Sequence, residues 1–213
     1  MNRSSRDFPG PPDDTGRDTI ARQRGRYTSG GNDRMADQDT TIRLIRVDDA
    51  EVIAAHRARD RRAYAAWEPA QPDEFYTAAG QRRRIETLLA EHDRGERWPA
   101  VILAGGEVVG QVTVSTILRG PFRKGFLGYW VASAFDSRGH ATRAVSQILT
   151  VMTEELGLHR AEAHTRMDNL ASQRVLRANG FRPWGIAHAH IFLDGAWHDE
   201  VFWERMLDDT PSS

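Results

Sequence analysis

The sequence of 213 residues contains no cysteine. A thiol nucleophile, a disulfide framework and thiolate metal ligands are therefore excluded, and the absence fits a reducing compartment. No apolar run approaches the roughly 20 residues that a membrane helix needs, and the N-terminus has no apolar leader segment. Neither sign of charge is in excess, since the formal net charge is -1, which argues against nonspecific nucleic-acid binding as the main function. We therefore expect a cytoplasmic protein without membrane or direct nucleic-acid partners.

Aliphatic residues are almost lacking from residues 1–39, which are rich in Gly, Pro, Ser, Arg and Asp. Such a segment cannot bury enough apolar surface to offset the entropy of ordering, so we predict a disordered N-terminal tail. Met35 is an alternative start of translation, which the sequence leaves open. Residues 40–207 are then long enough for one domain with its own core, followed by a short tail at 208–213.

The hydrophobic pattern predicts seven strands and about four helices. The strands are expected at residues 41–47, 98–104, 107–118, 126–131, 160–166, 182–192 and 197–206. Helices are expected from Asp48 or Asp49 through residue 67, and at 73–92, 141–152 and 169–178. Gly105-Gly106 and Asp194-Gly195 each predict a two-residue hairpin turn between adjacent strands.

The stretch from Phe126 to Met152 joins an apolar strand to an amphipathic helix through a polar turn. Apolar residues at 141, 145, 148, 149 and 152 follow the spacing of one buried helix face. The start of this helix offers unpaired amides to an anion such as a pyrophosphate. The residues placed to do so are Arg138, Gly139, His140, Ala141 and Thr142. Gly139 is equally consistent with an ordinary turn, and the residues alone do not decide between the two.

Four sequence motifs resemble the GNAT acetyltransferases, and in particular their Rim-type N-terminal acetyltransferase branch. SRGHAT at 137–142 is similar to the pyrophosphate loop, and AAWEP at 65–69 to the loop on the acceptor side. GLHRAEAHTRMDNLASQRVLRANGF at 157–181 and FLDGAWHDEVFW at 192–203 resemble the second half of the branch. The similarity covers roughly residues 40–207. The loop departs from the family at its first position, where Asp136 stands in place of Arg or Gln.

The resemblance implies an α/β (α+β) fold with a central, mixed and mostly antiparallel twisted sheet. In this fold about four helices flank about seven strands, and a V-shaped splay separates strands 4 and 5. Acetyl-CoA is the implied cosubstrate, with its pantetheine lying in the splay. The amides of Trp130, Val131 and Ala132 would contact pantetheine and the thioester carbonyl, stabilising the oxyanion of the tetrahedral intermediate. The same residues also suit a plain core strand.

Asn169 and Ser172 lie three residues apart, so both side chains can face one ligand from one side of a helix. On the residues alone, Asn169 is equally a helix N-cap and Ser172 a polar residue of the first turn. The resemblance implies more: Asn169 matches a position that contacts the cofactor, and Ser172 matches the hydroxyl that protonates the departing CoA thiolate.

A general base is harder to assign, because Glu68, Glu162, His164 and His198 are all candidates. At pH 7 a lysine amine is neutral to about one part in 2,500, whereas an α-amine is neutral to roughly a seventh. An α-amine acceptor therefore needs little help. Glu68 would orient its ammonium group or take its proton through water.

His188 and His190 are two apart on a strand and suggest a metal site with His164 or Asp199, although exposed strand histidines are common. Because the family needs no metal, we expect none. We predict an acetyl-CoA-dependent N-acetyltransferase that acts on a primary amine, with the α-amine of a ribosomal protein as the expected acceptor. A small-molecule amine or antibiotic, a CoA-binding regulatory module without turnover, and a homodimer remain open.

Overall fold

The computed structural model describes residues 39–208, so the predicted tails lie outside it apart from Asp39 and Asp208. The strands are β1 (Thr40–Leu44), β2 (Trp98–Ala104), β3 (Glu107–Leu118), β4 (Lys124–Val131), β5 (Arg160–Arg166), β6 (Arg182–Leu193) and β7 (Ala196–Met206). The α-helices are α2 (Ala50–Arg59), α3 (Arg61–Tyr64), α4 (Ala78–Asp93), α5 (His140–Glu154) and α6 (Leu170–Ala178). Short 3-10 helices lie at η1 (Val47–Asp49), η2 (Asp73–Tyr76) and η3 (Ser133–Phe135).

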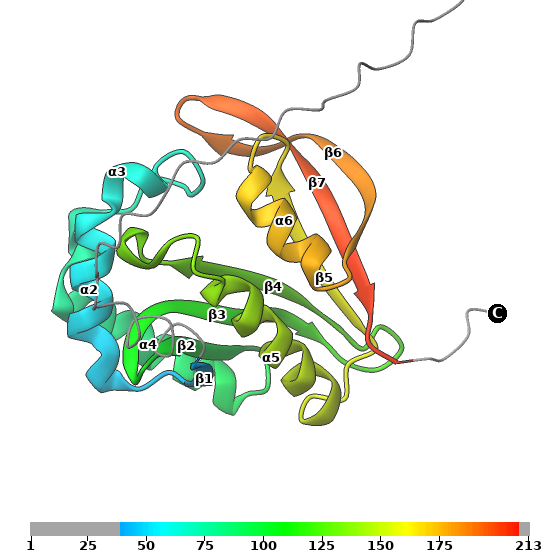
Figure 1. Cartoon of the computed structure of the whole chain (residues 1–213), viewed down its shortest axis with the longest axis horizontal. Helices are drawn as coiled ribbons and strands as arrows, with labels where there is room; N and C mark the ends of the chain where they lie inside the picture. The colour runs from blue at the N-terminus through cyan, green and yellow to red at the C-terminus, as the bar shows by residue number, and fades with distance from the viewer. Residues whose placement is uncertain (1–38, 209–213) are drawn as a thin grey trace, which may run out of the picture. The chain divides into compact units, whose positions relative to one another are not determined.

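All seven strands form one sheet in the order β1-β2-β3-β4-β5-β7-β6. Every neighbouring pair is antiparallel except β4 and β5, which run parallel. Only three residue pairs join those two strands, from Lys124–Arg160 to Phe126–Glu162. Beyond Phe126 the strands diverge (Figure 1). The seven strands and the V-shaped splay between the fourth and fifth are thus confirmed.

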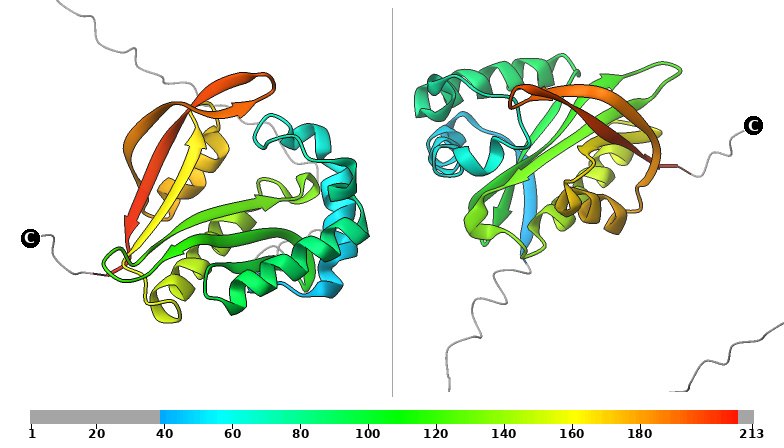
Figure 2. Two further views of the ribbon diagram at one scale, coloured as in Figure 1. Left: turned by 180° about the vertical axis from the view of Figure 1, so that it is seen from behind. Right: turned by 90° about the horizontal axis from the view of Figure 1, so that it is seen from above.

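Helices cover both faces of the half-sheet β1–β4 (Figure 2). Helix α5 lies on one face, while α2 and α4 lie on the other. Helix α6 lies over the second half-sheet, on the same side as α5. The apolar core is divided accordingly. One cluster includes Ile148 of α5, Leu176 of α6 and Trp203 of β7; the other includes Ile53 of α2 and Ile85 of α4.

Helix α5 confirms the pattern read from the sequence. Val145, Ile148, Leu149 and Met152 are buried, with at most 3% of their surface exposed. Burying a side chain of this size contributes about 1.5–3 kcal/mol, so the four together supply roughly 6–12 kcal/mol that fixes the helix against the sheet. The position of the helix start, which the site depends on, is determined by this packing.

The region between β1 and β2 differs from its prediction, because two expected helices are each interrupted. The first is divided into α2 and α3 at Asp60, whose carboxylate accepts hydrogen bonds from the amide and hydroxyl of Ser133 at 2.8 and 2.6 Å. The second begins five residues late, at Ala78, because the Thr77 side chain caps it by accepting from the Gly80 amide. Residues 39–208 therefore contain five α-helices where about four were expected, and the end of α2 is hydrogen-bonded to the turn after β4.

Both predicted hairpin turns are confirmed. Gly105 and Gly106 have φ values of 56° and 89°, and Asp194 and Gly195 have φ values of 49° and 77°. Two consecutive positive φ values are typical of the tight turns that match strand twist, and glycine adopts them without steric cost.

Candidate active site

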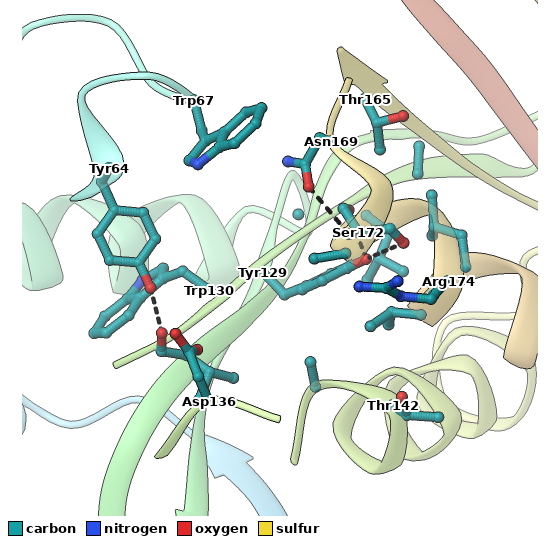
Figure 3. A pocket seen from close by; sticks show the side chains of 18 of the residues that line it. Tyr64, Trp67, Tyr129, Trp130, Asp136, Thr142, Thr165, Asn169, Ser172 and Arg174 are labelled. Carbon is teal, nitrogen blue, oxygen red and sulfur yellow. Dashed lines mark hydrogen bonds between the residues drawn. The ribbon is translucent and has the colours of Figure 1, made fainter. Parts of the chain in front are cut away.

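A cavity of about 770 Å³ lies where β4 and β5 separate. Figure 3 shows its lining, to which α3, the loop before α5 and the start of α6 also contribute. Nearly all the residues expected at the site from the sequence line this one cavity: Glu68, Trp130, Val131, Gly139, His140, Ala141, Thr142, Asn169 and Ser172. The expected residues Ala132 and Arg138 do not line it.

The loop before α5 has the left-handed backbone that the anion-binding reading requires. Ser137 and Gly139 have φ values of 62° and 83°. Gly139 is the N-cap residue, and no side chain caps the helix. The amides of Ala141 and Thr142 are therefore at an uncapped helix start that opens on the cavity, where an anion is stabilised by the helix dipole.

Side chains behind this loop hold it in place. The His140 ring is buried, with 1% of the residue exposed, and its Nδ1 lies 2.9 Å from the Thr40 hydroxyl. Arg143 donates to the same hydroxyl at 2.8 Å and to the Arg138 carbonyl at 2.7 Å. The His140 ring is therefore directed into the protein behind the loop, and it is the backbone of His140 that lines the cavity. Thr40 and Arg143 are positioning residues that the sequence did not reveal, since Thr40 is a hundred positions away.

Asp136 lines the cavity and is the residue that departs from the family pattern. Burial, together with the charge of Asp60, raises the pKa of the Asp136 carboxyl. Among residues 39–208 its carboxylate makes no hydrogen bond, and in particular it does not cap the amides of Ser137 and Arg138. Its negative charge therefore faces the cavity without compensation from the loop.

The edge of β4 corrects one expectation. The Ala132 amide donates to the Val109 carbonyl on β3 at 2.8 Å, so it cannot also bind pantetheine. Trp130 lies two residues earlier, and its amide faces β3 as well, because hydrogen-bonding direction alternates along a strand. Val131 is left with its amide toward the cavity, while its carbonyl accepts from the Tyr64 hydroxyl.

Ser172 and Asn169 meet on the opposite wall. Asn169 is the N-cap of α6 and accepts from the Ser172 amide at 3.1 Å, which is the structural role that the sequence left open. The Ser172 hydroxyl lies 2.8 Å from that of Tyr129 on β4. Burial raises the pKa of Tyr129 to about 12, against the opposing effect of the Ser172 hydrogen bond. Tyr129 therefore stays a neutral phenol that can orient the Ser172 hydroxyl toward the cavity.

Glu68 marks the other end of the cavity, beside Trp67. Both of its carboxylate oxygens accept from Arg57, one of them at 3.1 Å. The Arg57 side chain is itself buried, and its guanidinium lies 4.8 to 5.2 Å from the ring centres of Tyr64, Phe75 and Trp130. Glu68 is thus a fixed negative charge rather than a mobile one.

A bridge between the two half-sheets lies at the same end. Arg166 of β5 donates to the Ala66 carbonyl at 2.8 Å. Its guanidinium also lies 5.3 Å from the centre of the Trp67 ring. The loop after α3 is therefore fastened to β5 across the wide end of the V. This contact joins residues a hundred positions apart, and sequence periodicity gives no signal for it.

Two of the other candidate bases are engaged elsewhere. Glu162 is buried and accepts from Lys124 and Arg160 at the narrow end of the V. His198 contacts the Leu193 carbonyl of the β6–β7 hairpin at 3.2 Å. Neither lines the cavity, whereas His164 does.

The suggested metal pair is separated by an irregularity in β6. Ala189 has a φ of 47°, and the register with β7 shifts between Ala187 and Ile191. His188 consequently bonds Asp199 and His190 bonds Glu200, two adjacent residues whose side chains point to opposite faces of β7. In the described part of the chain no three His, Asp or Glu residues are grouped as metal ligands. Within residues 39–208 no helix is long and apolar enough to cross a membrane.

Comparison with known proteins adds to this geometry. Residues 39–182 match the family model described as an acetyltransferase (GNAT) domain. The chain is 31% identical to a probable N-acetyltransferase, YjcK, of Bacillus subtilis, over 74% of this chain and 88% of the relative. It is 25% identical to the [Ribosomal protein uS5]-alanine N-acetyltransferase of Escherichia coli, over 79% of this chain and 88% of the relative. A solved structure of Mycobacterium smegmatis RimJ in complex with CoA-disulfide superposes with a TM-score of 0.77 at 32% identity, covering 82% and 85% of the two chains.

Proposed function

The chain belongs to the GNAT acetyltransferase family, and from this premise we propose that it acetylates the α-amine of a protein, of the ribosomal-protein type. It is an acetyl-CoA-dependent N-acetyltransferase, with residues 40–207 as its catalytic domain. The observation that most directly supports the acceptor is the similarity, over 79% of the chain, to an enzyme named for the alanine of a ribosomal protein. Such an acceptor implies a cytoplasmic enzyme.

The cofactor end of the cavity is the loop before α5. The pyrophosphate would meet the amides of His140, Ala141 and Thr142, with Gly139 allowing close approach. Pantetheine would lie along the free edge of β4, where the Val131 amide faces the thioester oxygen. Arg138 would meet the phosphates from outside the cavity. These assignments are consistent with the helix start and the β4 edge being open toward the same space.

The chemistry is direct attack of the amine on the thioester carbonyl carbon. The bond from carbon to nitrogen forms, the bond from carbon to sulfur breaks, and the thiolate leaves. Ser172 would donate its hydroxyl proton to this sulfur, and Tyr129 holds it in position at 2.8 Å. Glu68, held in place by Arg57, would accept a hydrogen bond from the acceptor ammonium on a remaining lone pair and so orient it.

Intact-mass measurement with two matched peptides tests the acceptor. One begins with a free alanine α-amine and lacks lysine; the other has a blocked α-amine and a single lysine. We expect acetyl-CoA to add one acetyl group to the first peptide only. Acetylation of the second alone would reassign the enzyme to side-chain amines. Turnover only on small amines would make it a metabolite acetyltransferase, and no turnover on any amine would favour a binding module.

A further inference from the structure

Two histidines of the acceptor-side half-sheet share one buried carboxylate. Glu200 of β7 has only 4% of its surface exposed. Its Oε1 lies 3.0 Å from Nδ1 of His164, and its Oε2 lies 2.6 Å from Nδ1 of His190. The two imidazole rings lie edge to face, 5.8 Å apart between centres. No step of the reaction given above uses this cluster.

The state of the carboxylate determines how both rings are protonated. Burial pushes the pKa of Glu200 upward, but the hydrogen bonds from His164 and His190 outweigh it and hold the pKa below the usual range of a glutamate. An ionised carboxylate only accepts, so Nδ1 of each neutral ring carries the hydrogen. Nε2 of each ring then has a free lone pair and is the basic atom.

Only one of the two rings reaches the cavity. His164 and Glu200 line it together with Glu68 and Trp67, while His190 does not. The His164 ring stacks on Phe202, 5.6 Å between centres, and lies edge-on to Phe126 of β4. Its position is therefore fixed on two sides by aromatic rings and on a third by the carboxylate.

The other charged groups on this face are occupied. Arg166, two residues further along β5, is bound to the Ala66 carbonyl and to Asp168. Glu162, two residues before His164, is bound to Lys124 and Arg160. His164 itself is hydrogen-bonded to Glu200, and its ring lies edge to face with the ring of His190. Of the base candidates considered, Glu68 and His164 line the cavity; Glu68 is engaged by Arg57, whereas His164 is backed by the Glu200 carboxylate.

We infer that His164 is the general base of the transfer, that its Nε2 takes the proton of the acceptor nitrogen, and that Glu200 is the positioning residue behind it. This inference rests on the proposed function. As the amine attacks and the bond from carbon to nitrogen forms, the surplus proton moves from nitrogen to Nε2 of His164. Glu200 stabilises the resulting imidazolium. The proton then leaves to water, and Ser172, having protonated the sulfur, takes one back from water.

The test compares single-turnover rates of wild type and His164→Ala with saturating acetyl-CoA and the alanine peptide. Since an α-amine is already partly neutral at pH 7, we expect a loss of about 100-fold, at the low end of the range for general bases. Protonation of the α-amine alone gives an acid limb in both proteins, so the readout is the slope of that limb. The wild type needs both a neutral amine and an unprotonated base, so its rate should fall more steeply in acid than that of the variant. Added imidazole should restore part of the rate of His164→Ala by occupying the space beside Phe202.

His188→Ala is the matched control. It removes an imidazole bonded to a neighbouring carboxylate, Asp199, outside the cavity, and it should keep the wild-type rate and acid limb with no response to imidazole. His164→Asn keeps a donor toward Glu200, so it remains a usable test if His164→Ala fails to fold. The melting temperature and an acetyl-CoA titration check that both His164 variants are folded and bind the cosubstrate. An active wild type with an unchanged His164→Ala rate and acid limb refutes the base but not the function. A wild type without turnover on any amine refutes both.

Discussion

Gly139 offers the sharpest test of the cofactor loop. Its φ of 83° is left-handed, and a Cβ at this position would lie 2.7 Å from Nη1 of Arg143. An L-residue in this backbone region costs about 1–2 kcal/mol. In Gly139→Ala the left-handed backbone and the contact with Arg143 are unfavourable together, so we expect the loop to relax and acetyl-CoA to restore its shape on binding. Arg143 must also move, which weakens its hydrogen bond to the Arg138 carbonyl.

Relaxation of the loop predicts an affinity for acetyl-CoA lower by about 5- to 30-fold, the equivalent of 1–2 kcal/mol. Calorimetric titration measures it directly. Gly106→Ala is the matched control, because Gly106 has a φ of 89° in the β2–β3 turn with nothing within 4 Å of the added Cβ. This control should lower the melting temperature by about 2–4 °C per kcal/mol of strain and leave acetyl-CoA affinity unchanged. The loop would be excluded from the cofactor site if Gly139→Ala bound acetyl-CoA as tightly as wild type and its melting temperature fell only as much as that of Gly106→Ala.

Three further changes are predicted. Ser172→Ala should lower kcat by about 10- to 1,000-fold with little change in acetyl-CoA affinity, because the proton transfer to sulfur occurs only in the transition state; equal single-turnover rates would contradict this. Asp136→Asn should tighten acetyl-CoA binding at low salt, and the gain in affinity should shrink as salt rises. The pKa of Asp136 is raised in the folded protein, so its ionised form destabilises the fold; the variant should melt at a higher temperature near neutral pH, and this difference should vanish in acid. Asp60→Ala should lower the free energy of unfolding by about 1–3 kcal/mol near pH 7, because the Ser133 amide loses its acceptor. Burial raises the pKa of Asp60, but hydrogen bonds from Arg59 and Ser133 bring it below normal. The difference between wild type and variant in denaturant unfolding should therefore close as the pH falls through the folded pKa of Asp60.

Periodicity predicted the strands and α5 well, because burial of one face leaves a regular trace in the sequence. Periodicity failed where a single residue interrupts a helix or shifts the register of a strand. The break of α2 at Asp60 depends on a bond to Ser133, 73 positions away. The opposite directions of His188 and His190 depend on a positive φ at Ala189, a residue type that gives no warning of it.

The sequence predicted which residues form the candidate site, but not how their side chains and amides are oriented. Sequence motifs located the helix start and Ser172, yet the pairing of Tyr129 with Ser172 joins elements 43 positions apart. Likewise, the engaged amide of Ala132 follows from its register with β3, which local composition does not encode. Contacts of this range require the assembled sheet.

The three residue pairs that join β4 to β5 leave both strands with bare edges inside the wedge. Exposed edges are a liability, because their free amides and carbonyls can pair with another chain. A pantetheine arm lying there would supply amide groups of its own and act as a surrogate strand. At a free ligand concentration of 100 times Kd, such binding adds about 2.7 kcal/mol to the folded state. The supply of acetyl-CoA would then govern not only how fast this protein works but how long it survives, with starved cells holding a pool more open to aggregation and proteolysis.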